Sequence, residues 1–149
     1  NNLYNHPKIK AMISLTKGEG FGRPLLEFSM VNKPIITTNF SGHLDFLDKN
    51  KVVILNGELE NVHHSAANKW LMKEAQWFKV NESETGKYLK DVFKNYKSYL
   101  VDAKKQGFEN RNNFNWLKMS EKLDDIFHDN LPNFPDKVDI NLPDLTNLK

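Results

Sequence analysis

The sequence predicts an α/β fold, with a Rossmann-like parallel sheet and flanking helices. Short aliphatic and β-branched runs alternate with helical patterns through the first half of the chain, and the links between them are short. This order is typical of βαβ units, whose strands run parallel. The length of 149 residues is that of one ordinary domain, long enough to bury a core.

Three apolar runs are the expected strands of this sheet, at residues 11–15, 35–38 and 52–55. Runs of this kind are typical of strands buried on both faces, so we expect them to be neighbours. A glycine-rich turn, residues 18–22, leads from the first strand into a short helix. We expect that helix to begin near Pro24. A backbone N–H in the first turn of a helix has no acceptor within the helix, so proline, which lacks this group, is well tolerated there. A second short helical segment is expected at residues 41–47.

The second half of the chain is predicted to be largely helical. Residues 61–74 are mixed and are expected to form a loop with a short helix, before a last strand at 77–80. Asn81, with Glu84 three residues later, resembles a capping box, and the apolar spacing predicts one helix from there to about Ala103. Gly107 is the expected helix stop. The expected elements that follow are a terminal helix over 116–127, and a Pro/Asp/Asn-rich tail over 129–149 that is separate from a domain over 1–128.

Composition excludes several classes of function. The formal net charge is only +2, which indicates neither nucleic acid nor an anionic membrane as a partner. There is no cysteine, which excludes disulfides, thiolate metal sites and a cysteine nucleophile. No apolar run reaches the roughly 20 residues that span a bilayer, and no signal peptide is recognisable. We therefore expect a cytoplasmic protein.

The residues that suggest chemistry lie between Lys17 and Asp45. A glycine-rich turn that enters a helix brings backbone N–H groups and the positive end of the helix dipole together, which favours an anion such as phosphate. Gly18, Gly20 and Gly22 do not fit the dinucleotide fingerprint. The acidic residue that this fingerprint needs about 20 positions later is absent as well. A phosphate-binding P-loop is also excluded, because no Gly-Lys-Ser/Thr follows.

Two glutamates, Glu19 and Glu27, stand beside this anion site. A carboxylate next to a phosphate is unfavourable unless it serves hydroxyl groups, and a carboxylate can accept two hydroxyl hydrogen bonds at once. A sugar and a ribose that flank a diphosphate present such hydroxyls. The alternative is that Glu27 complements the helix dipole and Glu19 is a solvated loop residue.

Residues 18–27, Gly-Glu-Gly-Phe-Gly-Arg-Pro-Leu-Leu-Glu, resemble the E-x7-E signature of retaining GT-B glycosyltransferases, particularly the GT4-like group 1 enzymes. Residues 33–38 and 41–45 look like the "P-V-I-x-T, G-G-x-x-E" segment of that family. The resemblance covers about residues 5–128. It implies the C-terminal, nucleotide-sugar-binding domain of such an enzyme, incomplete at its N-terminal side. A hexosyltransferase-type enzyme is the implied activity.

The resemblance implies a role for each residue of the motif. Glu19 is the implied catalytic residue and contacts hydroxyls of the donor sugar, while Glu27 contacts the ribose hydroxyls. The implied donor-binding residues are Glu19, Phe21, Gly22, Arg23, Pro24, Leu25 and Glu27: the amides around Gly22 meet the sugar, the helix start at Pro24 faces the diphosphate, and Leu25 lies under the nucleotide. The family generally needs no metal and no cofactor beyond its nucleoside diphosphate sugar, because basic groups and helix dipoles neutralise the leaving group. The acceptor is not identified.

Ser41 and Asp45 depart from the family pattern, since they replace a glycine and a glutamate. The family's basic pair, its opening strands and its acceptor domain also lie upstream of the region where this sequence begins. We therefore expect an open sheet edge, a homo-oligomer that covers it, and no activity in the isolated chain. Lys17 and His43 are two further candidates for ligand contact; a solvated surface lysine is the simpler interpretation of Lys17.

Several alternatives stay open. The chain is a non-catalytic α/β interaction module with residual or no nucleotide binding if the motif has lost its role, and a GT-B epimerase is a weaker option. His63 and His64 do not predict a metal site, because adjacent side chains point apart and no third ligand is marked. The three tryptophans suggest core packing more than sugar stacking.

Overall fold

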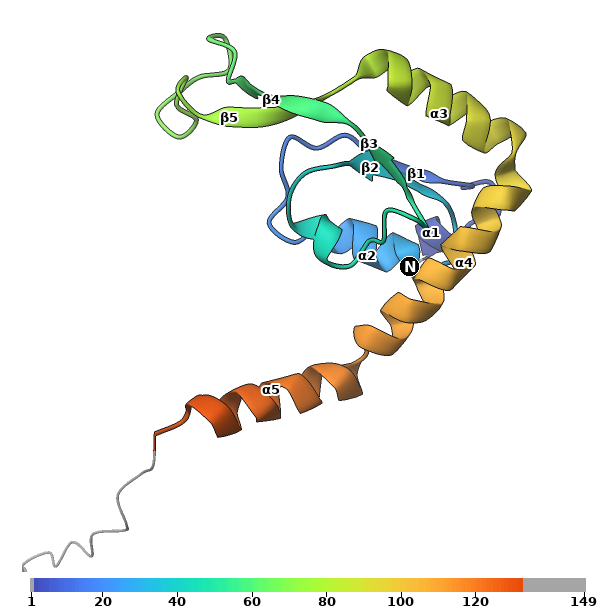
Figure 1. Cartoon of the computed structure of the whole chain (residues 1–149), viewed down its shortest axis with the longest axis vertical. Helices are drawn as coiled ribbons and strands as arrows, with labels where there is room; N and C mark the ends of the chain where they lie inside the picture. The colour runs from blue at the N-terminus through green and yellow to red at the C-terminus, as the bar shows by residue number, and fades with distance from the viewer. Residues whose placement is uncertain (1, 133–149) are drawn as a thin grey trace, which may run out of the picture. The chain divides into compact units, whose positions relative to one another are not determined.

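A computed structural model describes residues 2–132 of the chain (Figure 1). The chain divides into two compact units, one over Asn1–Asn115 and a second that begins at Trp116. The domain that the sequence predicted, over residues 1–128, extends past this division into the second unit. The tail from residue 133 onward lies outside the described residues. Asp129 and Asn130, which the sequence assigned to the tail, are the last residues of a helix.

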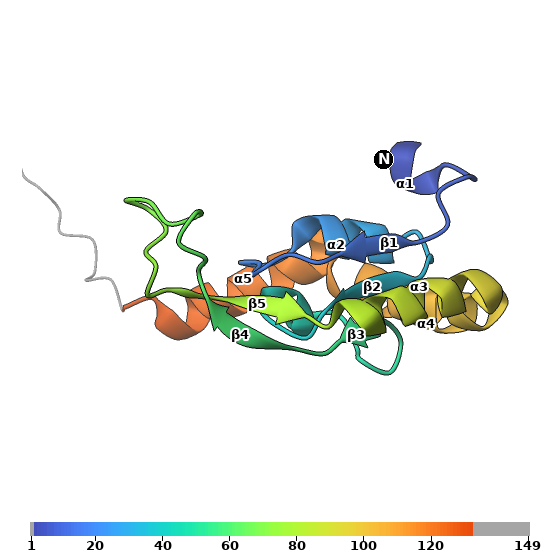
Figure 2. The ribbon, with the colours of Figure 1, turned by 90° about the horizontal axis from the view of Figure 1, so that it is seen from above.

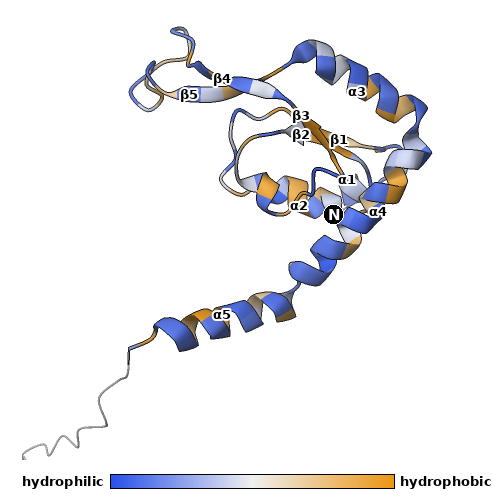
Figure 3. Ribbon diagram, viewed as in Figure 1, coloured by the Kyte–Doolittle hydropathy of each residue, from blue (hydrophilic) through white to orange (hydrophobic). Residues whose placement is uncertain are grey.

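The first unit is built on a three-stranded parallel sheet, as predicted. Its strands are β1 (Met12–Ser14), β2 (Ile35–Thr38) and β3 (Val53–Leu55), in the order β1-β2-β3. Ile13 pairs with Ile36, and Thr37 pairs with Ile54. The central strand β2 is buried along its whole length, which explains its continuous run of β-branched residues. Figure 3 shows apolar residues concentrated on these strands.

Helices cover the two faces of the sheet (Figures 1 and 2). On one face, α2 (Arg23–Ser29) buries Leu25 and Phe28 against Ile35 of β2. The short helix α1 (Asn2–Asn5) adds Tyr4, whose ring meets that of Phe28 edge to face at 5.3 Å. On the other face, α3 (Glu82–Lys94) contributes Val92 to a second cluster whose other buried residues are Ile36, Val53 and Leu55. The three short strands thus receive apolar cover from both sides.

The next helix, α4 (Tyr96–Asn113), is fixed to the amino ends of the strands. The Tyr96 hydroxyl donates to the carbonyl of Lys10, just before β1. The Gln106 amide donates to the carbonyl of Phe46 and accepts from the N–H of Asp48, both of which precede β3. These bonds hold α4 at the amino edge of the sheet, so the opposite, carboxyl edge is the one left for a ligand.

The predicted helix start at Asn81 is confirmed, but the helix does not continue to Ala103. The Asn81 side chain accepts from the N–H of Glu84 at 3.1 Å. The helix then ends at Asn95, whose backbone leaves helical geometry at φ −108° and ψ 28° and whose amide side chain donates to Asp91. The Tyr99 hydroxyl of α4 also donates to Asp91, and burial, with this bond, raises the pKa of Tyr99 to about 12. Asp91 therefore ties the two helices together across the bend.

The expectation that Gly107 stops a helix is wrong, because this residue lies inside α4. A Cβ at Gly107 would come within 2.6 Å of the carbonyl oxygen of Ser29 and 2.3 Å of Asn32 Oδ1. The absence of a side chain lets α4 approach the end of α2. Asn110, one turn later, donates to the Ser29 hydroxyl at 2.7 Å. The glycine thus serves helix packing instead of helix termination.

Replacing Gly107 by alanine is expected to destabilise the protein by about 1–2 kcal/mol. Forcing a methyl group into a packed contact costs about 1–3 kcal/mol, and the better helix propensity of alanine returns up to about 1 kcal/mol. Gly86 is the matched control, since it lies inside α3 and a Cβ there would meet nothing within 4 Å. Gly86→Ala should therefore stabilise by about 0.5–1 kcal/mol. Urea unfolding of both variants checks this; shifts of the same sign would contradict the assignment.

The segment between β3 and α3 forms an antiparallel hairpin that the sequence did not predict. Its strands are β4 (Gly57–Asn61) and β5 (Gln76–Val80), with Gly57 opposite Val80. The expected strand at 77–80 is thus confirmed, but the expected short helix within 61–74 is not found. The only large apolar side chain of β4 is Leu59, so the alternation that marks a half-buried strand is faint there.

The described part of the second unit is one helix, α5 (Trp116–Asn130), as predicted. None of its residues is buried, and its exposed apolar side chains include Trp116, Leu123 and Ile126. Within residues 2–132, no helix has the length and apolar character that crossing a membrane would require.

Candidate functional site

The glycine-rich turn lies at the carboxyl edge of the sheet, where the sequence placed it. Ser41, three residues beyond the end of β2, accepts a hydrogen bond from the N–H of Glu19 at 2.6 Å, and its hydroxyl donates to the Glu19 carbonyl. The N–H of Gly42 also donates to that carbonyl, at 3.1 Å. The loop after β1 and the loop after β2 are thereby joined at Glu19.

Close backbone packing explains why small residues occupy this junction. A Cβ at Gly42, the first residue of the 3-10 helix η1 (Gly42–Asp45), would lie 2.0 Å from the carbonyl oxygen of Gly20. Gly22 has φ 83°, in the left-handed region that favours glycine. Ser41 also has a positive φ, 90°. Ser41 thus adopts a backbone conformation that glycine adopts without strain, and its hydroxyl supplies the link to Glu19.

His43 lies inside the fold beneath this junction, with no exposed surface. Its Nε2 is 2.7 Å from the carbonyl oxygen of Thr38 and 3.3 Å from the Thr37 hydroxyl. Because a carbonyl only accepts, Nε2 carries the proton and donates to Thr38. His43 therefore joins η1 to the end of β2. Its Nδ1 and the Thr38 hydroxyl are buried atoms with no partner among the described residues.

Glu27 and Arg23 form an ion pair on the surface of α2. Arg23 Nε lies 2.8 Å from Glu27 Oε1, with 83% and 41% of the two side chains exposed. Glu27 is the fifth residue of the helix, a turn beyond its start. An exposed pair four residues apart contributes only about 0.3–0.5 kcal/mol, so a ligand hydroxyl competes for the Glu27 carboxylate at small cost.

The remaining motif residues separate into loop and core. The Phe21 side chain is 44% exposed and its ring packs on Phe46 at a centroid distance of 5.0 Å. Pro24 occupies the first turn of α2, as predicted. Leu25 is 1% exposed and belongs to the core, so its side chain supports the helix and does not face a ligand.

Lys17 is held at the side of the loop by the hairpin. The N–H of Phe78 in β5 donates to the Lys17 carbonyl at 3.1 Å, and the Lys17 ammonium lies 4.6 Å from the centre of the Trp77 ring. The Trp77 indole N–H donates to Glu60 at 3.2 Å. Hydrogen bonding by Lys79, and secondarily by Trp77, holds the pKa of Glu60 below its usual value. Sequence reasoning missed this support because it comes from the unpredicted hairpin.

The described residues contain no group of three or more histidine, aspartate or glutamate side chains placed to hold a metal ion. The side chains of His63 and His64 were expected to point apart, but their ring centres lie 4.1 Å apart with the ring planes tilted by 38°. His63 also hydrogen-bonds the Ser65 hydroxyl.

Comparison with known proteins adds no relative: no family model, curated protein or solved structure matches this chain.

Proposed function

We propose that the chain is the donor nucleotide-sugar-binding part of a retaining, metal-independent glycosyltransferase. The observation that carries the proposal is the setting of Glu19. Its backbone is bonded on both sides, to Ser41 and Gly42, while its half-buried carboxylate makes no hydrogen bond or ion pair within the described residues. A carboxylate with free acceptor oxygens, carried on a fixed backbone at the carboxyl edge of a parallel sheet, suits a ligand that is rich in hydroxyl groups.

Backbone donors lie next to this carboxylate. Within residues 2–132, the N–H groups of Gly20, Phe21 and Gly22 donate no backbone hydrogen bond. No side chain caps the start of α2 either. Free amide donors beside a carboxylate acceptor match a molecule that carries both oxyanions and hydroxyls. A nucleoside diphosphate sugar carries both.

In this proposal the two glutamates bind different parts of the donor. Glu19 accepts from hydroxyls of the sugar, and Glu27, released from Arg23, accepts from the ribose. Lys17 and the freed Arg23 add positive charge near the diphosphate, where charge develops on the leaving group. The nucleotide base, the sugar and the acceptor are left open by this assignment.

Glu27→Ala is expected to weaken binding of both UDP and UDP-glucose, whereas Glu19→Ala should weaken only the sugar nucleotide. The hydroxyls that Glu19 serves are absent from the free nucleotide. Hydrogen bonds to a charged group contribute about 1.5–3 kcal/mol, or about ten- to a hundredfold in affinity. Isothermal titration with UDP, GDP and ADP and their sugar conjugates measures both effects.

Glu58→Ala is the matched control, because Glu58 is an exposed carboxylate on β4 outside the proposed site. It should bind like the unchanged chain. Equal losses for both ligands in both site variants would contradict the division of roles. Lack of binding by the unchanged chain to every nucleotide tested would instead favour the alternative, a non-catalytic α/β interaction module.

A further inference from the structure

The loop that joins β4 to β5 ends in an exposed apolar tip. We call residues 69–73, Lys-Trp-Leu-Met-Lys, the hairpin tip. Trp70 is 83% exposed and Met72 is 64% exposed. Such large apolar side chains are costly to leave in water, and a cluster of them in a loop marks a contact surface. The proposed donor site makes no use of them.

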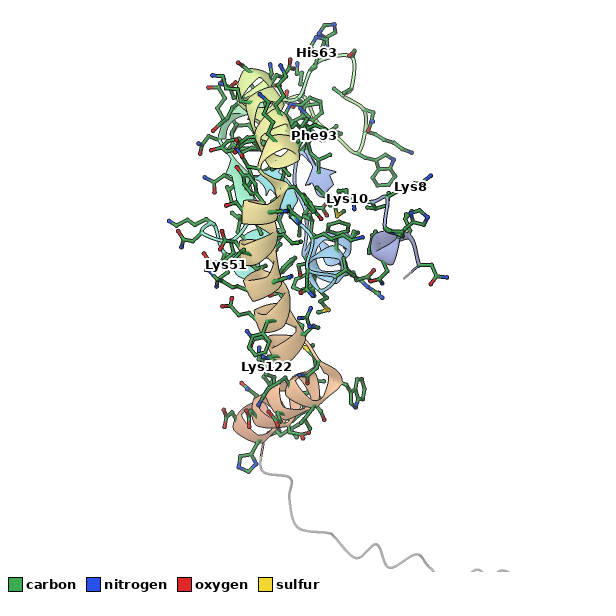
Figure 4. All side chains as sticks on the ribbon, turned by 90° about the vertical axis from the view of Figure 1, so that its right-hand side faces the viewer. Lys8, Lys10, Lys51, His63, Phe93 and Lys122 are labelled. Atoms are coloured by element: carbon green, nitrogen blue, oxygen red, sulfur yellow. The ribbon has the colours of Figure 1, made fainter. Side chains whose placement is uncertain are left out.

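The base of the loop is held in place by contacts at the end of the hairpin. Val62, at the foot of the loop, is buried, and its N–H donates to the carbonyl of Ala75 at 2.9 Å across the hairpin. Figures 1 and 2 both show the loop projecting away from the sheet and from α3. His63, labelled in Figure 4, belongs to the same loop.

A turn centred on Asn68 pairs part of the backbone of the tip. The Asn68 side chain accepts from the N–H of Trp70 at 2.8 Å and from the N–H of Leu71 at 3.0 Å. The Asn68 N–H in turn donates to the Leu71 carbonyl at 2.9 Å. Amide groups that enter an apolar medium without a partner cost several kcal/mol, and this turn removes that cost for the N–H groups of Trp70 and Leu71.

The charges around the tip indicate that it binds a negatively charged surface. Lys69 and Lys73 flank the apolar residues, and Glu74 lies next to them, so residues 69–74 carry a net charge of +1 (two lysines, one glutamate). The Lys69 ammonium lies 5.0 Å from the centre of the Trp70 ring. The Lys73 ammonium lies 3.7 Å from Glu74, in a pair that is largely exposed. Long lysine side chains keep their charge at the level of lipid headgroups while neighbouring apolar groups insert below it.

We propose that the hairpin tip docks on an anionic lipid surface, with Trp70 and Met72 inserted at the boundary between headgroups and acyl chains. Lys69 and Lys73 contact the lipid phosphates. The inference is independent of the proposed glycosyltransferase function, because it uses no residue of the donor site.

Helix α5 is the other candidate for a lipid-binding surface, and its charge distinguishes it from the hairpin tip. It exposes Trp116, 88% accessible, but its two lysines are outnumbered by four acidic residues, Glu121, Asp124, Asp125 and Asp129. An anionic surface repels that helix and attracts the tip.

The test is co-sedimentation of the full 149-residue chain with vesicles of equal parts phosphatidylglycerol and phosphatidylcholine. The unchanged chain should bind these vesicles, and bind less at high salt or on pure phosphatidylcholine. Trp70→Ala should lower the partition coefficient about tenfold or more. Lys69→Gln and Lys73→Gln should each lower it about fivefold.

Matched controls are Trp116→Ala for the tryptophan and Lys87→Gln for the lysines, since Lys87 is an exposed residue of α3. Both controls should bind like the unchanged chain. The inference is overturned if the chain does not bind the anionic vesicles or if Trp116→Ala has the effect of Trp70→Ala. It is also overturned if the chain binds pure phosphatidylcholine vesicles as strongly as the anionic ones. Circular dichroism verifies that every variant is folded, and all these substitutions lie at exposed positions.

Discussion

Replacing Gly42 by alanine is expected to destabilise the first unit by about 3–5 kcal/mol. The new Cβ would lie 2.0 Å from the carbonyl oxygen of Gly20 and 3.2 Å from that of Glu19. Both neighbours are backbone atoms, which cannot rotate away as a flexible side chain does. Overpacking costs about 1–3 kcal/mol, and separation of the two loops also breaks the hydrogen bonds from Gly42 and Ser41 to Glu19, each worth about 0.5–1.5 kcal/mol.

The matched control for this prediction lies in the same turn. A Cβ at Gly20 would meet nothing within 4 Å, so Gly20→Ala should change stability by no more than about 0.5 kcal/mol. Urea unfolding measures the difference between the two variants. Similar unfolding midpoints would show that the loops are joined more loosely than the Glu19–Ser41 contacts indicate.

The sheet and the location of the turn could be predicted from sequence because their signals are local and strong. The strands β1, β2 and β3 are built mainly from aliphatic and β-branched residues, which is typical of strands covered on both faces. Pro24 marks a helix start through its missing N–H, and Asn81 marks another through its side-chain oxygen. Each of these features depends on residues close together in the chain.

The features that escaped prediction depend on contacts between distant residues. In the sequence, Gly107 resembles a helix stop. Its role depends instead on the close contact of α4 with Ser29 and Asn32, which are distant in the chain. The bend at Asn95 brings the Tyr99 hydroxyl of α4 to Asp91 of α3, which also accepts from the Asn95 side chain. His43 lies beside a ligand motif in the sequence, yet its ring is directed into the fold toward Thr38. No local pattern carries this information.

The isolated chain is expected to transfer no sugar, even if it binds a donor. Transfer needs the donor and an acceptor held in line, and such positioning lowers a barrier by roughly 7–11 kcal/mol. Residues 2–132 contain a single parallel sheet, so the domain that holds an acceptor in a two-domain glycosyltransferase is not among them.

An exposed helix start adds only about 0.3–1 kcal/mol of favourable interaction with an anion, far less than a clamped pair of basic side chains supplies to a leaving diphosphate. We therefore expect turnover below detection in a transfer and donor-hydrolysis assay that uses radiolabelled UDP-, GDP- and ADP-sugars. Donor binding in the same samples, followed by titration, keeps this result distinct from a failure to bind. Robust turnover would show that residues of this chain supply both positioning and charge.

Sedimentation of the same samples should show a dimer or a larger species. Among the described residues β1 pairs only with β2, and the side chains of Ile13 and Leu15 along its free edge are 42% and 43% exposed. A free strand edge presents unpaired N–H and C=O groups that a second copy can bind. Ile13→Lys places a charge on that edge and should shift the chain toward monomer without changing the donor loop. A monomeric unchanged chain would contradict self-association. A monomer that also transfers sugar would contradict the predicted lack of turnover as well.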